Sequence, residues 1–204
     1  RLYFALLTLA FSQLLYTIVF QWYDFTGGSD GIHGIGRPEV LSSPLNFYYF
    51  SLAVVFTCII FLWRIVESPF GWSLRAIREN VERAQFLGIN DRLYRLIAFS
   101  ISGCVAAVAG ALYTFFQKWA SPDLLFWTTS AEPVLMCILG GMFNFFGPAV
   151  GTIFFIILRQ VITDYTLYWP FALGTILLFL VLFIPQGIMG FATELIERFR
   201  KSYR

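Results

Sequence analysis

Few side chains in this sequence are of types that carry out chemistry, and they stand far apart. His33 is the only histidine, and Cys58, Cys104 and Cys137 lie in separate apolar runs without the spacing of a metal site or a disulfide framework. The sequence has no GxxxxGK(S/T) loop for nucleotide phosphates, no HExxH metal motif and no GxSxG nucleophile. We therefore predict no catalytic residue, no metal site and no cofactor bound by this chain.

Two charged residues in apolar surroundings are candidates for contact with a solute. Glu132 precedes Pro133, and we expect it at the N-terminus of a short helix, where the helix dipole favours a carboxylate. Alternatively, Glu132 could bind the ammonium group of a zwitterionic solute near the outer mouth of a pathway. Arg159 is expected near the outer end of its span, where it could snorkel to the interface or pair with Asp164 or Glu132.

The composition indicates that these residues belong to a membrane protein. Hydrophobic residues make up 58 % of the chain and charged residues 13 %, against about 45–50 % and about 25 % in soluble domains. A crossing helix needs about 20 mostly apolar residues, which all but one of the apolar runs supply or approach. The runs are 2–22, 45–66, 94–117, 133–142, 148–164 and 169–185. Because 133–142 is short and ends at Gly140 and Gly141, we predict an all-α, polytopic helical bundle with one broken or re-entrant helix.

Polar and small residues within the spans suggest how the helices meet. Ser12 and Gln13 lie on neighbouring polar ridges of the first span, where they could form interhelical hydrogen bonds or line a solute pathway. Small residues at helical spacing allow helix backbones to approach closely, so we predict tight packing where they recur. They are Ser102, Gly103, Ala106 and Gly110 in the third span, and Gly147 and Gly151 in a later one.

Basic residues gather around the polar segment 67–93 and after the last span. By the positive-inside rule both places are cytoplasmic, so both ends of the chain are predicted inside, with 133–142 counted as a crossing. The tail 187–204 has apolar residues at helical spacing and is predicted to be an amphipathic helix at the membrane surface. The basic residues are Arg64, Arg75, Arg78, Arg83, Arg92 and Arg95 in the first group, and Arg198, Arg200, Lys201 and Arg204 in the second.

The segment 67–93 also carries signals of ordered structure. Ser68 followed by Pro69 is a plausible helix start, Asn80 is suited to cap a second short helix, and Gly88 suits the left-handed turn that ends it. The segment could be a solvated loop between two spans or an element that binds another protein. An apolar ridge on the first helix favours the second interpretation, because an ordered helix outside the bilayer needs a surface to bury such a ridge.

The sequence RAIREN followed by ERAQFLGIN resembles the cytoplasmic signature of ABC-importer permeases of the branched-chain amino-acid class (LivM-type). Further stretches resemble the same family in the same order, and together they cover nearly the whole chain. They are YFALLTLAFSQ at 3–13 with TGGSDGI at 26–32, SPDLLFWTTSAE at 121–132, and LMCILGGMFNFFGPAVG at 135–151. The resemblance implies a permease subunit in the bacterial cytoplasmic (inner) membrane, here without the N-terminal spans that family members usually carry.

The resemblance also implies a coupling helix that sits in a groove of a separate ATPase subunit, where ATP and Mg²⁺ bind. The other implied partners are a second, related permease subunit and an extracytoplasmic solute-binding protein; the lipid bilayer surrounds the spans, and no nucleic acid is expected. The residues assigned to coupling are Leu74, Arg75, Ala76, Ile77, Arg78, Glu79 and Asn80, with Gly88 as a structural turn.

In the resembling family the TGGSDG segment lies beside the outer end of the pathway. Gly27 and Gly28 are therefore candidates to receive solute, although a plain tight turn would explain them as well. The residues assigned to the pathway are Ser12, Gln13, Gly27, Gly28, Glu132, Gly140 and Gly141.

We expect import of branched-chain or related amino acids by alternating access, with urea or short amides as alternative solutes within the family. An ion-coupled secondary transporter is the alternative from another class, but no acidic residue lies clearly in mid-span.

Overall fold

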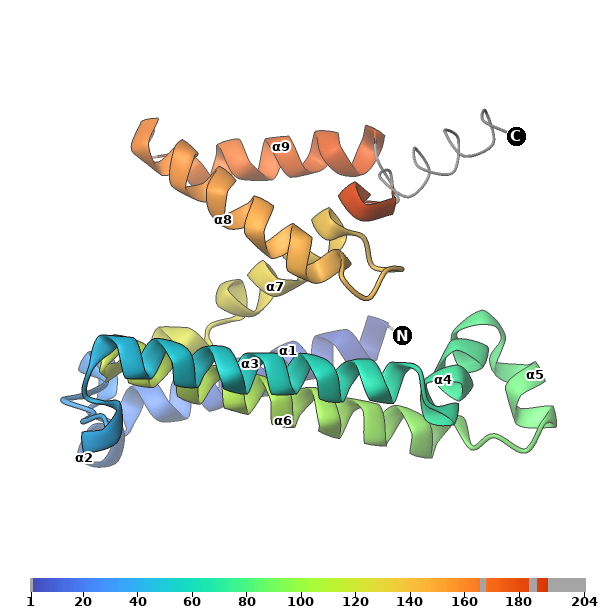
Figure 1. Cartoon of the computed structure of the whole chain (residues 1–204), viewed down its shortest axis with the longest axis horizontal. Helices are drawn as coiled ribbons and strands as arrows, with labels where there is room; N and C mark the ends of the chain where they lie inside the picture. Colours follow the sequence, from blue (N-terminus) through green and yellow to red (C-terminus); the bar gives the residue numbers. More distant parts are fainter. Residues whose placement is uncertain (1, 166–167, 184–186, 191–204) are drawn as a thin grey trace. The chain divides into compact units, whose positions relative to one another are not determined.

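The computed structural model describes residues 2–165, 168–183 and 187–190, and these residues are mostly helical (Figure 1). The chain forms two compact units. The first comprises Arg1–Gln21 with Pro122–Arg204, and the second comprises Trp22–Ser121. The prediction of an all-α polytopic protein is confirmed.

The second unit is built on two long helices, α3 and α6, which run side by side (Figure 1). The short helices α4 and α5 lie at one end of this pair, and a two-stranded ladder lies at the other. The elements are α2 (Tyr23–Thr26), η1 (Gly28–Asp30), β1 (Ile32–His33), η2 (Glu39–Leu41), α3 (Pro44–Val66), α4 (Pro69–Glu79), α5 (Val81–Phe86), α6 (Asp91–Gln117) and β2 (Trp119–Ala120).

The first unit has a small apolar core between its three C-terminal helices. Leu139, Phe155 and Leu173, one from each of these helices, are at most 5 % exposed. The elements are α1 (Leu2–Gln21), η3 (Pro122–Leu125), α7 (Trp127–Gly140), α8 (Gly147–Tyr165) and α9 (Trp169–Phe183).

Glycines bring α7 and α8 into backbone contact. A Cβ added at Gly151 would collide with the carbonyl oxygen of Met136 and with the backbone of Gly140, and one at Gly140 would collide with Gly147. The predicted close packing is therefore confirmed for this pair. It is not found at Gly103 and Gly110 of α6, where an added Cβ would have no described atom within 4 Å.

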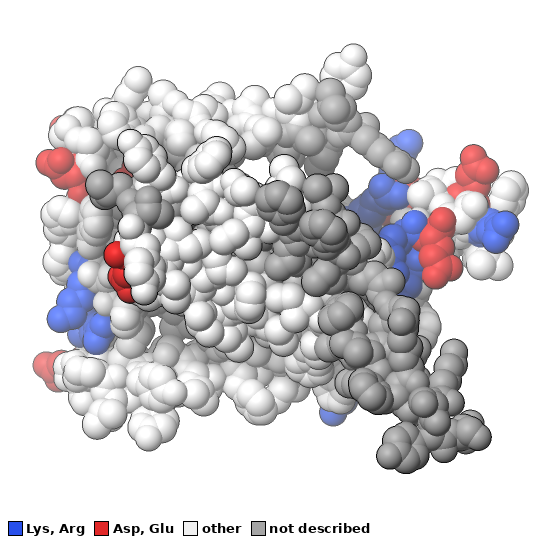
Figure 2. Space-filling view, turned by 90° about the horizontal axis from the view of Figure 1, so that it is seen from above, with Lys and Arg blue, Asp and Glu red and all other residues white. Residues whose placement is uncertain are grey.

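Helix length and composition support several membrane crossings. Among the described residues, α3, α6 and α8 are each long and apolar enough to cross a membrane, and α1 together with α2 makes a fourth candidate that is bent. The helices α7 and α9 have 14 and 15 residues, about 21–23 Å at 1.5 Å per residue, which is shorter than the roughly 30 Å hydrocarbon core. The visible surface is largely uncharged (Figure 2).

The structure corrects the prediction for the short segment 133–142. Its helix, α7, starts earlier at Trp127, so Pro133 lies inside the helix and Glu132 is not at its N-terminus. The helix starts before the proline because the Phe126 carbonyl already accepts hydrogen bonds from the amides of Thr129 and Ser130. The predicted span 169–185 and tail 187–204 extend beyond the described residues, at 184–186 and 191–204.

Candidate functional site

The segment between α3 and α6 is an ordered pair of helices with a cap at each start. The Ser68 hydroxyl donates to the Ile65 carbonyl over 2.6 Å and accepts a long 3.5 Å hydrogen bond from the Gly71 amide at the start of α4. Gly71 itself packs against the backbone carbonyl of Val66, where a side chain would not fit. The predicted helix start is confirmed, and α4 is attached directly to the end of α3.

The second short helix, α5, begins and ends as the sequence predicts. The Asn80 side-chain oxygen accepts a hydrogen bond from the Arg83 amide over 3.0 Å, which satisfies an amide that the helix itself leaves unpaired. Gly88 has a φ of +81°, in the left-handed region that favours glycine. The Gln85 side chain then donates to Asp91 at the start of α6 over 2.8 Å, so α5 is tied to the next span.

The apolar ridge of α4 faces the rest of its own unit. Ile77 is 4 % exposed, and Leu74 lines an apolar groove of about 360 Å³ with Phe70 and residues of α3 and α6. Phe70 also stacks on Tyr94, with ring centroids 5.2 Å apart. These side chains hold α4 on the membrane helices, so of the coupling residues Ile77 has no surface left for another protein.

Other side chains of this segment are exposed. Arg78, Glu79 and Asn80 lie on the surface at the junction of α4 and α5, and Ala76 is half-buried. The Arg75 guanidinium lies 3.3 Å from the Glu67 carboxylate and 4.6 Å from the centre of the Trp72 ring. The position of the Arg75 side chain is therefore fixed in part by contacts within the chain.

The sequence analysis missed the most exposed apolar side chains of the segment. Phe86 is 91 % exposed and Leu87 is 78 % exposed, and both lie at the end of α5. The signal was available in the sequence, where Phe86 and Leu87 are two adjacent large apolar residues in a segment rich in charged ones. In the structure, the side chain that α5 buries is Ala84, at 1 % exposure. Exposed apolar side chains that lie together are typical of surfaces that contact a protein or a membrane, and not of a solvated loop.

At the other end of α3 and α6, a glycine-rich loop is tied to the end of α6. The Trp119 indole donates to the Asp30 carbonyl over 3.0 Å. The Arg37 guanidinium donates to the carbonyls of Phe115 and Phe116 over 2.9 and 3.0 Å, and it lies 4.3 Å from the Phe47 ring centre. Arg37 thus satisfies carbonyls that the last turn of a helix leaves unpaired.

The pathway candidates Gly27 and Gly28 belong to this loop. Both have positive φ, 72° and 57°, and Gly28 is buried against the Tyr23 ring. A tight turn with positive φ at both positions therefore explains why both residues are glycine.

The remaining pathway candidates belong to the first unit. The Ser12 hydroxyl donates to the Leu125 carbonyl over 3.3 Å, whereas Gln13 is exposed beside Trp127 in a shallow groove. Gly140 and Gly141 are buried in the backbone contacts around Gly147, which leaves them no surface for a solute.

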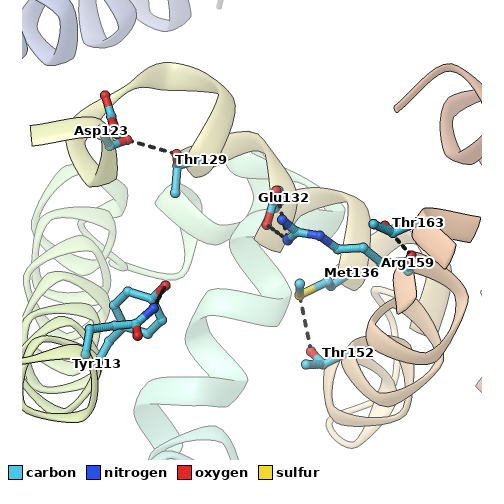
Figure 3. Close-up of polar contacts among 9 residues, drawn as sticks. Tyr113, Asp123, Thr129, Glu132, Met136, Thr152, Arg159 and Thr163 are labelled. Carbon is cyan, nitrogen blue, oxygen red and sulfur yellow. Dashed lines mark hydrogen bonds and ion pairs between the residues drawn. The ribbon is translucent and has the colours of Figure 1, made fainter. Parts of the chain in front are cut away.

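Glu132 is joined to Arg159, as Figure 3 shows. One guanidinium nitrogen, Nη1, lies 3.2 and 3.3 Å from the two carboxylate oxygens. The predicted pairing of Arg159 with Glu132 is thus present, and α7 and α8, which carry the two residues, pack against each other. No group of His, Cys, Asp and Glu side chains able to hold a metal ion occurs in the described part of the chain.

The chain is similar in sequence to known permease proteins. The model of the family described as "Branched-chain amino acid transport system / permease component" matches residues 1–185. The high-affinity branched-chain amino acid transport system permease protein LivM of Escherichia coli (strain K12) is 25% identical over 92% of this chain and 50% of its own length. The probable LivM of Methanocaldococcus jannaschii is 27% identical over 84% of this chain and 51% of its own length.

Another relative is the autoinducer 2 import system permease protein LsrC of Escherichia coli O9:H4 (strain HS), 29% identical over 58% of this chain and 35% of its own length. The chain spans about half the length of the LivM relatives that it matches. No solved structure matches it. Since the family model covers most of the sequence, the chain belongs to the family of permease components of branched-chain amino acid transport systems.

Proposed function

We propose that this chain is part of the permease subunit of an ATP-driven importer of branched-chain or related amino acids. It would lie in the cytoplasmic membrane of a bacterium with both of its ends inside the cell. A separate ATPase subunit hydrolyses ATP, a second related permease completes the pathway, and an extracytoplasmic binding protein delivers the solute. The family of the chain and the names of its LivM relatives support this assignment.

The observation that carries the proposal is the ordered pair α4–α5 with its exposed tip. A connecting loop needs neither caps at Ser68 and Asn80 nor two large apolar side chains in water. A groove on the ATPase that receives Phe86 and Leu87 would remove this apolar surface from water. Burial of each large side chain contributes about 1.5–3 kcal/mol.

The proposed mechanism is alternating access. ATP binding closes the ATPase dimer, and the bound α4–α5 pair moves with it. The pair is connected to α3 by the contact of Gly71 with the Val66 carbonyl, and to α6 by the hydrogen bond from Gln85 to Asp91. The movement therefore reaches the spans on either side.

The test is recovery of the ATPase with the purified permease. Changing Phe86→Ser together with Leu87→Ser is expected to lower that recovery about tenfold or more, because the apolar contact is lost. Arg78→Ala with Glu79→Ala is expected to weaken it less, since exposed charges contribute only up to about 1 kcal/mol each.

The matched control is Phe25→Ser. Phe25 is 73 % exposed in the same unit, but it lies in α2, away from α4–α5 (Figure 1), so recovery should stay unchanged. Full ATPase recovery with the Phe86 and Leu87 double variant would contradict the proposal.

A further inference from the structure

The apolar groove of the second unit lies between α3, α4 and α6. Its volume of about 360 Å³ is within the range of sites that hold small molecules. Ser102 is the only polar side chain among the described residues that line it. On α6 the lining runs from Ala98 to Ala109, about 16 Å along the helix. The groove therefore suits a long apolar chain that lies along a membrane helix, and not a polar solute.

The helix α4 borders this groove at one end of the α3–α6 pair (Figure 1). Phe70 and Leu74 of α4 line the groove, and Phe70 stacks on Tyr94 in the first turn of α6. The same helix carries Arg78 and Glu79 on the surface, so the polar boundary of the membrane lies at this end. An apolar chain in the groove would therefore have its polar end beside α4.

Three arginines lie at this end of the groove. Arg64 is in the last turn of α3, and Arg92 and Arg95 are in the first turns of α6. Arg95 precedes Ala98 by three positions, which places it on the face of α6 that lines the groove. The side chain of Arg95 is 57 % exposed.

The carboxylates nearest in the sequence leave part of this positive charge unbalanced. Glu67 lies 3.3 Å from Arg75, and Asp91 lies 3.8 Å from Arg95. Arg64 and Arg92 are exposed, and neither forms a hydrogen bond or ion pair with a described residue. A phosphate group would supply the missing negative charge, and the planar donors of arginine suit a phosphate.

We propose that the groove binds an acyl chain of an anionic phospholipid, with the lipid phosphate at Arg64, Arg92 and Arg95. Basic pockets between membrane helices on the cytoplasmic side bind such head groups. A lipid in this position would touch α3, α4 and α6 together and would stabilise α4 on the two spans. The inference goes beyond the proposed function and does not depend on which solute is carried.

The test measures lipid bound to the full-length permease by native mass spectrometry. Protein in mild detergent is mixed with equal amounts of dioleoyl phosphatidylglycerol and dioleoyl phosphatidylcholine, which have the same acyl chains. The wild type is expected to retain at least about fivefold more phosphatidylglycerol, since a single arginine near a head group contributes a factor of about five.

Arg95→Gln is expected to lower phosphatidylglycerol retention about fivefold and to leave phosphatidylcholine retention unchanged. The matched control is Arg83→Gln, which removes the same charge from α5, a helix that does not line the groove. Its phosphatidylglycerol retention should stay within about twofold of the wild type.

Ala106→Phe tests the acyl-chain site directly. Ala106 is exposed and lines the groove, so a phenyl ring there would fill the space and lower phosphatidylglycerol retention about tenfold or more. Val55→Phe is the control, because Val55 lines a groove formed by α3 residues alone, none of them basic. Lipid retention should be unchanged in this variant.

Equal retention of the two lipids by the wild type would overturn the inference, as would unchanged phosphatidylglycerol retention in either Arg95→Gln or Ala106→Phe. A lower melting temperature of Ala106→Phe with unchanged lipid retention would assign the groove to a neighbouring protein helix instead. If Ala106→Phe fails to fold, Arg95→Gln decides the case, because its exposed side chain is not needed for packing.

Discussion

The helices α7 and α8 are held together by backbone contact, whereas α6 has the same kind of glycine spacing and makes no such contact with the described residues. Gly140, Gly147 and Gly151 abut the backbone of the opposing helix. A Cβ at Gly103 or Gly110 would meet no described atom within 4 Å. The spacing of small residues therefore indicates that a helix can be approached closely, but it does not identify the neighbour.

The second unit is instead held at the ends of its helices. Arg37 joins the loop after α2 to the last turn of α6, and at the other end Phe70 stacks on Tyr94. Between these ends, the glycines of α6 have open space around them among the described residues. Four substitutions test this difference, and each is measured as a change in thermal stability or amide exchange of the purified protein in detergent.

The largest effect is expected from Gly151→Ala. The added methyl would meet the Met136 carbonyl and the Gly140 backbone, and overpacking of this kind costs about 1–3 kcal/mol. The matched control is Gly174→Ala in α9, where an added Cβ meets no described atom within 4 Å and the melting temperature should hardly change. Equal effects of the two substitutions would mean that the α7–α8 contact is not a determinant of stability.

Arg37→Ala is expected to lower stability by about 1–2 kcal/mol, because two charge-assisted hydrogen bonds to helix carbonyls are lost at a partly exposed site. Arg37→Lys keeps the charge but not the paired donors, so an intermediate melting temperature is expected. A melting temperature unaffected by Arg37→Ala would show that the end of α6 is held by other contacts.

Asn80→Ala is expected to cost about 1 kcal/mol through loss of the cap of α5. The effect should be local, so the readout is faster hydrogen exchange at the Arg83 amide. Asn80→Ser retains a capping oxygen and serves as the control; exchange equally fast in both variants would rule out the cap as the cause.

The smallest effect is expected from Gly110→Ala. Alanine is favoured over glycine in a helix by about 0.5–1 kcal/mol, and the site has open space, so the melting temperature of the isolated chain should stay constant or rise slightly. A marked fall would remove the contrast between α6 and the α7–α8 pair.

The sequence was sufficient where local chemistry determines structure. The α4–α5 pair follows from Ser68, Asn80 and Gly88, because caps and a left-handed turn act within a few residues. The long spans follow from the length of apolar runs. The coupling role of the α4–α5 pair, by contrast, comes from the resemblance to a family and not from local chemistry.

The sequence was not sufficient where distant segments determine structure. The strands Ile32–His33 and Trp119–Ala120 are two residues each, too short for an alternating pattern, and they form only because the loop meets the end of α6. Pro133 suggests a helix start in the sequence, although it lies inside α7. The choice of Glu132 as the partner of Arg159 depends on how α7 and α8 pack.

The helix α6 has 27 residues and no proline, which gives a continuous length of about 40 Å. Gln85 is bonded to Asp91 at its first residue, and Arg37 is bonded to carbonyls of its last turn. A tilt of about 5° at the α5 end would therefore displace the opposite end by about 3–4 Å. Because Arg37 attaches the glycine-rich loop to that end, the loop would be carried along, and events on the two faces of the membrane would be mechanically synchronised without any hinge between them.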